Sequence, residues 1–160
     1  MPKLTSFIRR CGNLTTQELE VLAAADWPKL ERLEVWLGGE RSTVNSVEQL
    51  RPLITAARGW PLRTLGLINH ELGPALLPEL AQLDWVKRLE RVSFAMCTFI
   101  DEDLGALVEF GARLEGQLDL TENQLSTKGV AELKRRLPSA IVERQRFDDW
   151  GPNRFVAVGE

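Results

Sequence analysis

The feature that most constrains the fold of this 160-residue chain is an apolar frame, L-x-x-L-x-L, that returns along most of its length. The frames begin at residues 4, 30, 62, 89 and about 115, so they are 26, 32, 27 and about 26 residues apart. One copy completes the longer pattern L-x-x-L-x-L-x-x-N/C-x-L with Cys97, and the next has Asn123 in the same slot. A unit of this length cannot bury its apolar residues alone and must stack on its neighbours. The frames therefore predict an α/β solenoid of about five to six repeats.

Between the frames, the apolar spacing changes from a period of 2 to a period near 3.6, which predicts that each strand is followed by a helix. The expected helices cover residues 16–25, 101–110 and 126–137. Two intermediate helices are expected to begin near Pro52 and Pro78, because proline fits the first turn of a helix.

Alternation along each strand sends the frame residues to one face, where they would form a continuous core that includes Leu65 and Val92. Asn123, at the bend after its strand, is expected to satisfy backbone groups of the turn, and Cys97 is expected to be a buried thiol and a weaker donor in the same slot. Three frames are preceded by tryptophans that would pack at helix-to-strand junctions: Trp27, Trp60 and Trp85.

The frames resemble those of leucine-rich-repeat proteins, most of all the ribonuclease-inhibitor-like subclass, and short bacterial leucine-rich-repeat proteins of unestablished role are similar. The resemblance covers residues 1–145 as the repeat domain and leaves 146–160 as a C-terminal cap or tail. It implies a curved parallel sheet on the concave side, helices on the convex side, and a binding scaffold rather than an enzyme. The chain departs from the family pattern at Arg9, where an inward apolar residue is expected, and at Gly38 and His70, where Asn or Cys is usual.

The outward positions of the frames would line the concave face of the sheet. The fifth frame positions form one predicted row across the strands: Ile8, Glu34, Gly66, Ser93 and Asp119. An apolar patch of Trp36, Ile68 and Met96 would be bordered by charged side chains, namely Arg32, Arg91, Glu34 and Asp119. An aromatic residue with apolar neighbours and arginines at the rim is typical of a protein-binding surface. The alternative is that Trp36 packs on its own neighbours or under the loop at 38–42.

Composition removes several classes of function. Lys and Arg number 20 against 23 Asp and Glu, a net charge of −3, so the chain lacks the basic excess that nucleic-acid binding needs. The sequence contains no 18-residue apolar stretch and no signal-peptide pattern, which predicts no membrane span. Two distant cysteines fit a reduced protein, so a cytoplasmic location is expected.

Catalytic and metal-binding motifs are missing, so no catalytic residue, cofactor or metal is assigned. An enzyme built on His70 and Glu71 is the weaker alternative, because neighbouring residues of a strand point to opposite faces. His70 is instead expected to be a turn or surface histidine. The acidic residues 101–103 are expected to cap a helix and to be solvated rather than to ligate a cation.

The ends of the solenoid raise two further expectations. The first frame begins three residues after Met1, which predicts an open strand edge at the N-terminal repeat and a possible homodimer through it. At the other end, residues 141–144 are expected to add a last strand. Phe147, Trp150 and Phe155 would then cover the final repeat, or else form a peptide that another molecule recognises.

Overall fold

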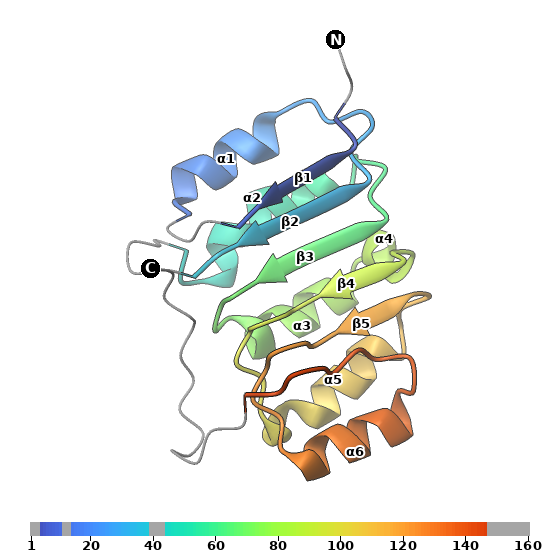
Figure 1. Cartoon of the computed structure of the whole chain (residues 1–160). Helices are drawn as coiled ribbons and strands as arrows, with labels where there is room; N and C mark the ends of the chain where they lie inside the picture. The colour runs from blue at the N-terminus through green and yellow to red at the C-terminus, as the bar shows by residue number, and fades with distance from the viewer. Residues whose placement is uncertain (1–3, 11–13, 39–43, 147–160) are drawn as a thin grey trace.

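A single parallel sheet forms one layer of the protein, which we describe from a computed structural model for residues 4–10, 14–38 and 44–146. Its strands follow the order of the sequence, β1-β2-β3-β4-β5 (Figure 1). Their bounds are β1 Ser6–Arg9, β2 Arg32–Trp36, β3 Thr64–Ile68, β4 Arg91–Ser93 and β5 Gln117–Asp119. Each strand lies in a predicted frame, so the expected parallel sheet is confirmed.

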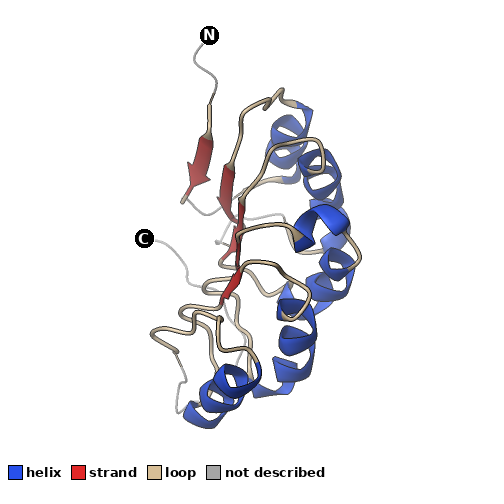
Figure 2. Ribbon diagram, turned by 90° about the vertical axis from the view of Figure 1, so that its right-hand side faces the viewer, coloured by secondary structure: helices blue, strands red, loops and turns tan. Residues whose placement is uncertain are grey.

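The helices form the second layer, on one face of the sheet, and the two layers follow an arc with the helices on its outer side (Figure 2). Their bounds are α1 Thr16–Ala24, α2 Val47–Ala57, α3 Gly73–Ala81, α4 Asp84–Lys87, the 3-10 turn η1 Asp101–Asp103, α5 Leu104–Gly111 and α6 Thr127–Arg136. The result is an α/β fold of stacked strand–helix units, which is solenoid-like.

The register of the sheet confirms the predicted rows. Glu34 pairs with Gly66, Gly66 with Ser93, and Ser93 with Asp119. The alternate positions form a buried row that includes Leu65, 2% exposed, and Val92, 0% exposed. The tryptophans at the helix-to-strand junctions are partly buried against this core, and Trp27 and Trp60 meet edge-to-face at 6.4 Å.

A sixth unit follows the last helix. Ile141 forms a parallel bridge to Asp119, and its N–H donates to the Leu118 carbonyl at 2.8 Å. The segment therefore continues the sheet by one short bridge, as expected for residues 141–144. The predicted cap residues 147–160 lie outside the described residues.

Arg9 departs from the frame pattern because it has an ionic partner on the helix layer. Its Nη1 donates to Glu18 Oε1 at 2.8 Å. Glu18 is also part of a capping box at the start of α1, where it accepts from the Thr15 backbone N–H at 2.8 Å. The hydrogen bonds from Arg9 and Thr15 lower the pKa of Glu18 to about 2. Strand and helix are thus joined by a charged contact where an apolar one is usual.

The predicted starts of the two intermediate helices are wrong. Helix α2 begins five residues before Pro52, and α3 begins five residues before Pro78. Burial of Leu50 and Leu76 upstream of these prolines favours the longer helices. Both prolines are exposed, so water can satisfy the carbonyl groups that lose a hydrogen bond.

Candidate functional site

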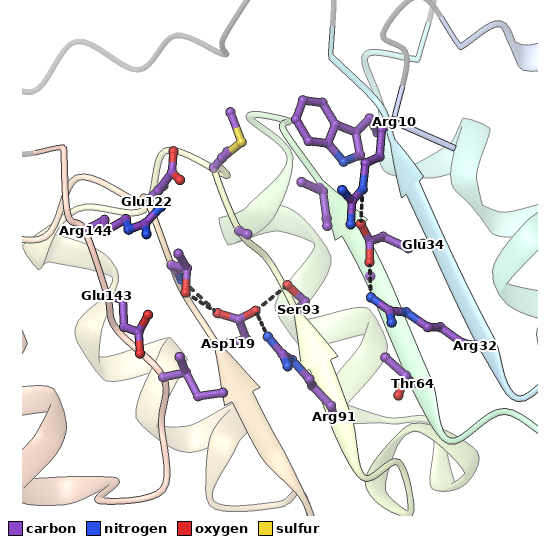
Figure 3. A pocket seen from close by; sticks show the side chains of 17 residues that line it. Arg10, Arg32, Glu34, Thr64, Arg91, Ser93, Asp119, Glu122, Glu143 and Arg144 are labelled. Carbon is purple, nitrogen blue, oxygen red and sulfur yellow. Dashed lines mark hydrogen bonds and ion pairs between the residues drawn. The ribbon is translucent and has the colours of Figure 1, made fainter. Parts of the chain in front are cut away.

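The face of the sheet opposite the helices carries a hollow of about 550 Å³. All seven residues predicted for partner binding line it: Arg32, Glu34, Trp36, Ile68, Arg91, Met96 and Asp119 (Figure 3). The hollow extends from Arg10 beyond the end of β1 to Arg144 after the last bridge. We call this hollow the groove.

A carboxylate shared by two arginines forms one side of the groove. Glu34 is only 8% exposed, and its Oε2 accepts from Arg32 Nη2 at 2.8 Å. Arg10 Nε lies 3.6 Å from the other oxygen of Glu34 (Figure 3). The side chain of Arg32 is 46% exposed and that of Arg10 is 67% exposed. The buried Glu34 carboxylate thus holds two guanidinium groups that remain accessible to a ligand.

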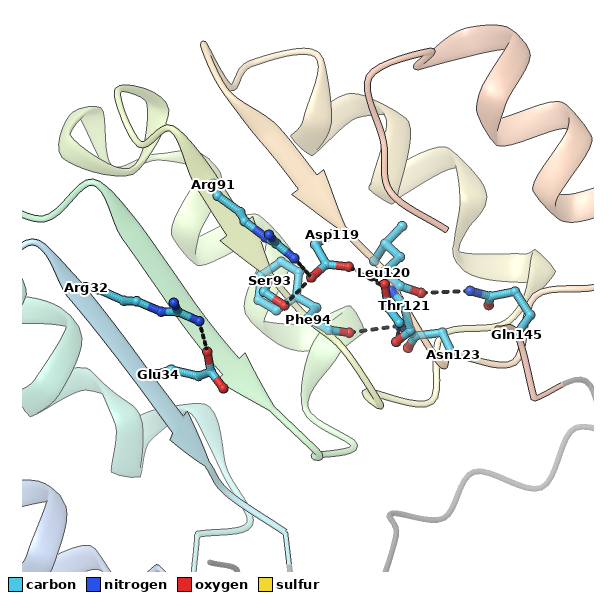
Figure 4. Close-up of polar contacts among 10 residues, drawn as sticks. All are labelled: Arg32, Glu34, Arg91, Ser93, Phe94, Asp119, Leu120, Thr121, Asn123 and Gln145. Carbon is cyan, nitrogen blue, oxygen red and sulfur yellow. Dashed lines mark hydrogen bonds and ion pairs between the residues drawn. The ribbon is translucent and has the colours of Figure 1, made fainter. Parts of the chain in front are cut away.

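A second buried carboxylate, that of Asp119, organises the other side of the groove. Its Oδ2 accepts from Arg91 Nη2 at 2.6 Å and from Ser93 Oγ at 2.9 Å. Its Oδ1 accepts from the backbone N–H and the hydroxyl of Thr121 at 3.0 and 2.7 Å (Figure 4). Burial alone would raise the pKa of Asp119, but the hydrogen bonds from Arg91, Thr121 and Ser93 outweigh it and lower the pKa below its ordinary value. Asp119 is therefore a charged residue with its acceptor positions filled.

The apolar part of the groove is smaller than the predicted patch. Trp36 is half-buried, and Ile68, on the neighbouring strand and in register with it, is only 6% exposed. The indole Nε1 of Trp36 is buried and has no hydrogen-bond partner among the described residues. The alternative packing of Trp36 under its loop involves residues 39–43, which lie outside the described residues.

Four groove residues were missed in the sequence analysis, because they come from the turn after β5 and from the last unit. They are Glu122, Ile141, Glu143 and Arg144. Glu122 forms an ion pair with Arg146. The backbone N–H of Glu122 donates to the Glu143 carbonyl at 2.9 Å, which places these groups next to each other. The expected strand at 141–144 was the available signal, since its outward positions fall on this face.

The turns that follow the strands are held by a repeated side-chain contact. Asn123 Nδ2 donates to the Phe94 carbonyl of the preceding unit at 2.8 Å, while its Oδ1 accepts from the N–H groups of Cys97 and Phe99, both at 3.0 Å (Figure 4). Cys97 Sγ makes the equivalent contact to the Leu67 carbonyl at 3.2 Å. The predicted roles of Asn123 and Cys97 are confirmed, and burial raises the pKa of the Cys97 thiol.

Gln145 extends this contact by one unit. Its Nε2 donates to the Leu120 carbonyl at 2.8 Å, and its Oε1 accepts from the Leu125 N–H at 3.2 Å (Figure 4). The residue just before each of these turn residues has a positive φ: 59° at Met96, 58° at Glu122 and 51° at Arg144. The same left-handed backbone thus recurs in each turn, and it directs these three side chains to the rim of the groove.

His70 lies in the turn after β3, as one part of the prediction stated, but it is not a surface residue, because it is 2% exposed. It follows β3 in the slot that Cys97 and Asn123 occupy in later units, so its ring lies inside the stack of turns. Nδ1 accepts from the Leu72 N–H at 3.0 Å, and burial lowers the pKa of His70 to about 4. Glu71 is exposed. The two residues considered for an enzyme thus lie in different environments.

Two of the three acidic residues at 101–103 have structural partners, and Glu102 between them is exposed. The carboxylate of Asp101 accepts hydrogen bonds from the backbone and hydroxyl of Ser126, at the start of α6, so it is not simply solvated as expected. Asp103 accepts from the Ile100 N–H at 3.0 Å, as a cap does. Within the described ranges, no group of three or more His, Cys, Asp or Glu side chains could hold a metal ion. No helix in the same ranges is long and apolar enough to cross a membrane.

Comparison with known proteins supports the architecture. The chain matches no protein-family model, and no curated protein matches it. Among solved structures, it is similar to the crystal structure of a Bacteroides fragilis protein that was a structural-genomics target, with a TM-score of 0.77 and 23% identity. The match covers 96% of this chain and 43% of that one, so the chain spans less than half the length of that structure. The likeness concerns the fold: an α/β protein of stacked strand–helix units.

Asn123→Ala should lower the free energy of unfolding by about 3 kcal/mol or more. The change removes the partners of two buried N–H groups and one carbonyl, and each unsatisfied buried group costs about 1–3 kcal/mol. Urea unfolding measures the loss. Lys128→Ala, an exposed change in the next helix, serves as the control and should stay within about 0.5 kcal/mol. A loss of that small size for Asn123→Ala would contradict the proposed bracing of the turns.

Asp119→Asn should destabilise the protein by about 1–3 kcal/mol at pH 7, because hydrogen bonds to a charged acceptor become weaker ones to an amide. A folded-state pKa below the unfolded value of about 3.9 stabilises the fold above that pH, and this contribution is lost as the pH falls through the folded value. The difference between wild type and variant should therefore shrink below about pH 4.

Urea unfolding across this pH range measures the Asp119 effect. Asp84→Asn, which alters an exposed ion pair with Lys87, should change stability by less than about 1 kcal/mol at any pH. A wild-type advantage over Asp119→Asn that is the same at pH 7 and pH 3 would show that the charge of Asp119 does not matter.

Proposed function

We propose that the chain is a leucine-rich-repeat solenoid of the ribonuclease-inhibitor-like subclass that binds a protein partner in its groove. The frame intervals, the parallel sheet in sequence order and the bracing of successive turns by Cys97, Asn123 and Gln145 support the repeat class. The observation that carries the binding role is the groove itself. It combines a half-buried tryptophan with arginines that buried carboxylates hold in place.

The width of the groove favours a protein over a small molecule. It extends from Arg10, just after β1, across β2 to β5 and the last unit, with ionic groups at both ends and Trp36 and Ile68 on its floor. Aromatic residues and arginines are enriched at protein interfaces, and arginines fixed before binding lose less conformational freedom when a partner arrives. A partner segment laid across the strands would contact several of them at once.

Binding without catalysis is the activity that these side chains support. The two buried carboxylates of the groove, Glu34 and Asp119, are engaged by arginines and, for Asp119, by hydroxyls, which suits recognition more than proton transfer. His70 lies inside the stack of turns, where a substrate in the groove would not touch it. We therefore propose no cofactor and no metal, a protein partner rather than nucleic acid or membrane, and a cytoplasmic location.

A second candidate function is self-association through the edge of the sheet. Among the described residues, β1 pairs in the sheet with β2 alone, so β1 is an edge strand of the described sheet. Two apolar side chains beside this edge are exposed, Leu4 at 47% and Ile8 at 41%. An exposed apolar edge is a ready template for pairing with another chain.

Trp36→Ala should weaken partner binding at least 30-fold, a loss of about 2 kcal/mol, while the melting temperature changes little. To find the partner, a photo-crosslinking residue is placed in the groove at Ala95 and, as a control, on the outer helix face at Thr55. A protein captured from Ala95 and not from Thr55 is purified, and its affinity is measured by calorimetry.

The result for Trp36 also distinguishes the two interpretations of its side chain. Thr55→Ala, on the helix face, should leave the affinity unchanged. Normal binding by Trp36→Ala together with a large loss of stability would assign Trp36 to the core. If Thr55→Ala lost affinity and Trp36→Ala did not, the partner would bind on the helices, and the groove proposal would be overturned.

The self-association candidate predicts a molar mass that rises with concentration in light scattering. Ile8→Lys should return the protein to a monomer, because a charge at a sheet edge opposes strand pairing. Val21→Lys, at another exposed apolar residue on α1, is the control and should leave association unchanged. A wild-type protein that stays monomeric at millimolar concentration would reject this candidate.

A further inference from the structure

We propose that the groove recognises an acidic side chain of the partner protein, whose carboxylate lies between Arg32 and Arg91. The inference rests on the proposed function, because it names what part of a partner the groove selects. The site is built from β2, β3 and β4, which are adjacent in the sheet. Four observations support it: the local charge, the shape of the floor, the free donors and the apolar neighbours.

The charge on this side of the groove is not balanced. Glu34 is one carboxylate with two guanidinium partners, Arg32 at 2.8 Å and Arg10 at 3.6 Å. One positive charge is therefore left without a counterion within this group. A partner carboxylate would supply it, and burial of the pair under the partner would strengthen the contact.

The other side of the groove does not attract an acid. Asp119 and Arg91 balance each other, and Glu122 is matched by Arg146. Glu143 and Arg144 add one charge of each sign beside these groups. The charge therefore changes along the groove, from positive over β2 to balanced beyond β5. This gradient places an acidic partner residue at the β2 side.

The floor between the two arginines carries only short side chains. Arg32, Thr64 and Arg91 are consecutive members of one row, so the two arginines lie two strands apart, about 10 Å between backbones. Thr64 lies between them (Figure 3). In the next row, a Cβ at Gly66 would come within 2.9 Å of Glu34 Cγ, so the glycine leaves room for the Glu34 side chain that holds Arg32.

The arginines keep donors for a ligand. A guanidinium has five N–H groups, and the described hydrogen bond from Arg32 uses the Nη2 nitrogen to reach Glu34. Arg32 and Arg91 are each 46% exposed although their carboxylate partners are buried. Each buried carboxylate thus fixes the position of a guanidinium whose outer edge faces the groove, and such an edge can bind a carboxylate through two hydrogen bonds.

The residue next to the acidic one in the partner should be apolar. Trp36 lies two residues beyond Glu34 on the same strand, and Ile68 is its neighbour in register. The Glu34 position and the Trp36 position are about 7 Å apart, the distance between alternate residues of a strand. Alternate side chains of an extended partner segment would have the same spacing. The occupant we commit to is therefore an extended segment of a partner protein that presents an Asp or Glu close to a large apolar side chain.

The test uses random 12-residue peptides displayed on phage, selected on the full chain and depleted on Trp36→Ala. Selected peptides are synthesised with their Asp or Glu and with Asn or Gln in its place. Both forms are measured against wild type, Arg32→Gln and Arg63→Gln. Arg32→Gln leaves Glu34 with Arg10, so the groove stays charge-compensated. Arg63, which pairs with Glu90 outside the groove, is the matched control.

We expect the acidic peptide to bind wild type and Arg63→Gln at least tenfold more tightly than its amide form, and to lose this preference on Arg32→Gln. Melting curves confirm that each variant is folded. Peptides that depend on Trp36 but bind equally as acid or amide would overturn this inference and leave the proposed function standing. A selection that yields no peptide dependent on Trp36 would overturn both.

Discussion

The structure depends on a shared register: side chains at the same frame position lie in a row across parallel strands. One face of each strand from β2 to β5 carries a leucine or valine of the core, as in the buried pair of Leu65 and Val92. The other face carries the residues between them, so the row that contains Glu34, Gly66 and Ser93 is fixed by the same pairing. Because a shift of one residue would send leucines to water and carboxylates to the core, the core determines which groove residues become neighbours.

Repetition made the fold predictable from the sequence. The apolar frame marks every strand, and its alternation assigns Glu34 and Asp119 to one row before any coordinates exist. Features that do not repeat were predicted less well. The helices around Pro52 and Pro78 begin earlier than expected, because burial of apolar residues outweighs the local preference of proline for a first turn. His70 is buried because the turns stack on one another, which a single turn cannot reveal.

The residues that line the groove were also predictable, but the ion pairs and the burial of their charged groups were not. Strand alternation identifies Arg91 and Asp119 as groove residues, while their contact at 2.6 Å depends on the side chains that adjacent strands bring together. The near-complete burial of Asp119 depends further on Ser93 and Thr121, which fill its acceptor positions. Glu143 could not be assigned from a frame because the last unit is short and lacks the full leucine pattern. The sequence therefore identifies the rows, and the partners within each row come from packing.

Burial of carboxylates on a face that could have been exposed has a physical consequence for binding. Removing Glu34 and Asp119 from water carries a cost that the hydrogen bonds from Arg32 and Arg91 offset. The apolar core lies on the opposite face of these strands, so burial of the core does not depend on these acids. Their effect is to hold two long, flexible guanidinium groups in fixed positions before a partner arrives, which reduces the entropy that binding would otherwise lose. An arrangement that the apolar core does not require, and that lowers the entropy cost of binding, supports the proposed binding role of the groove.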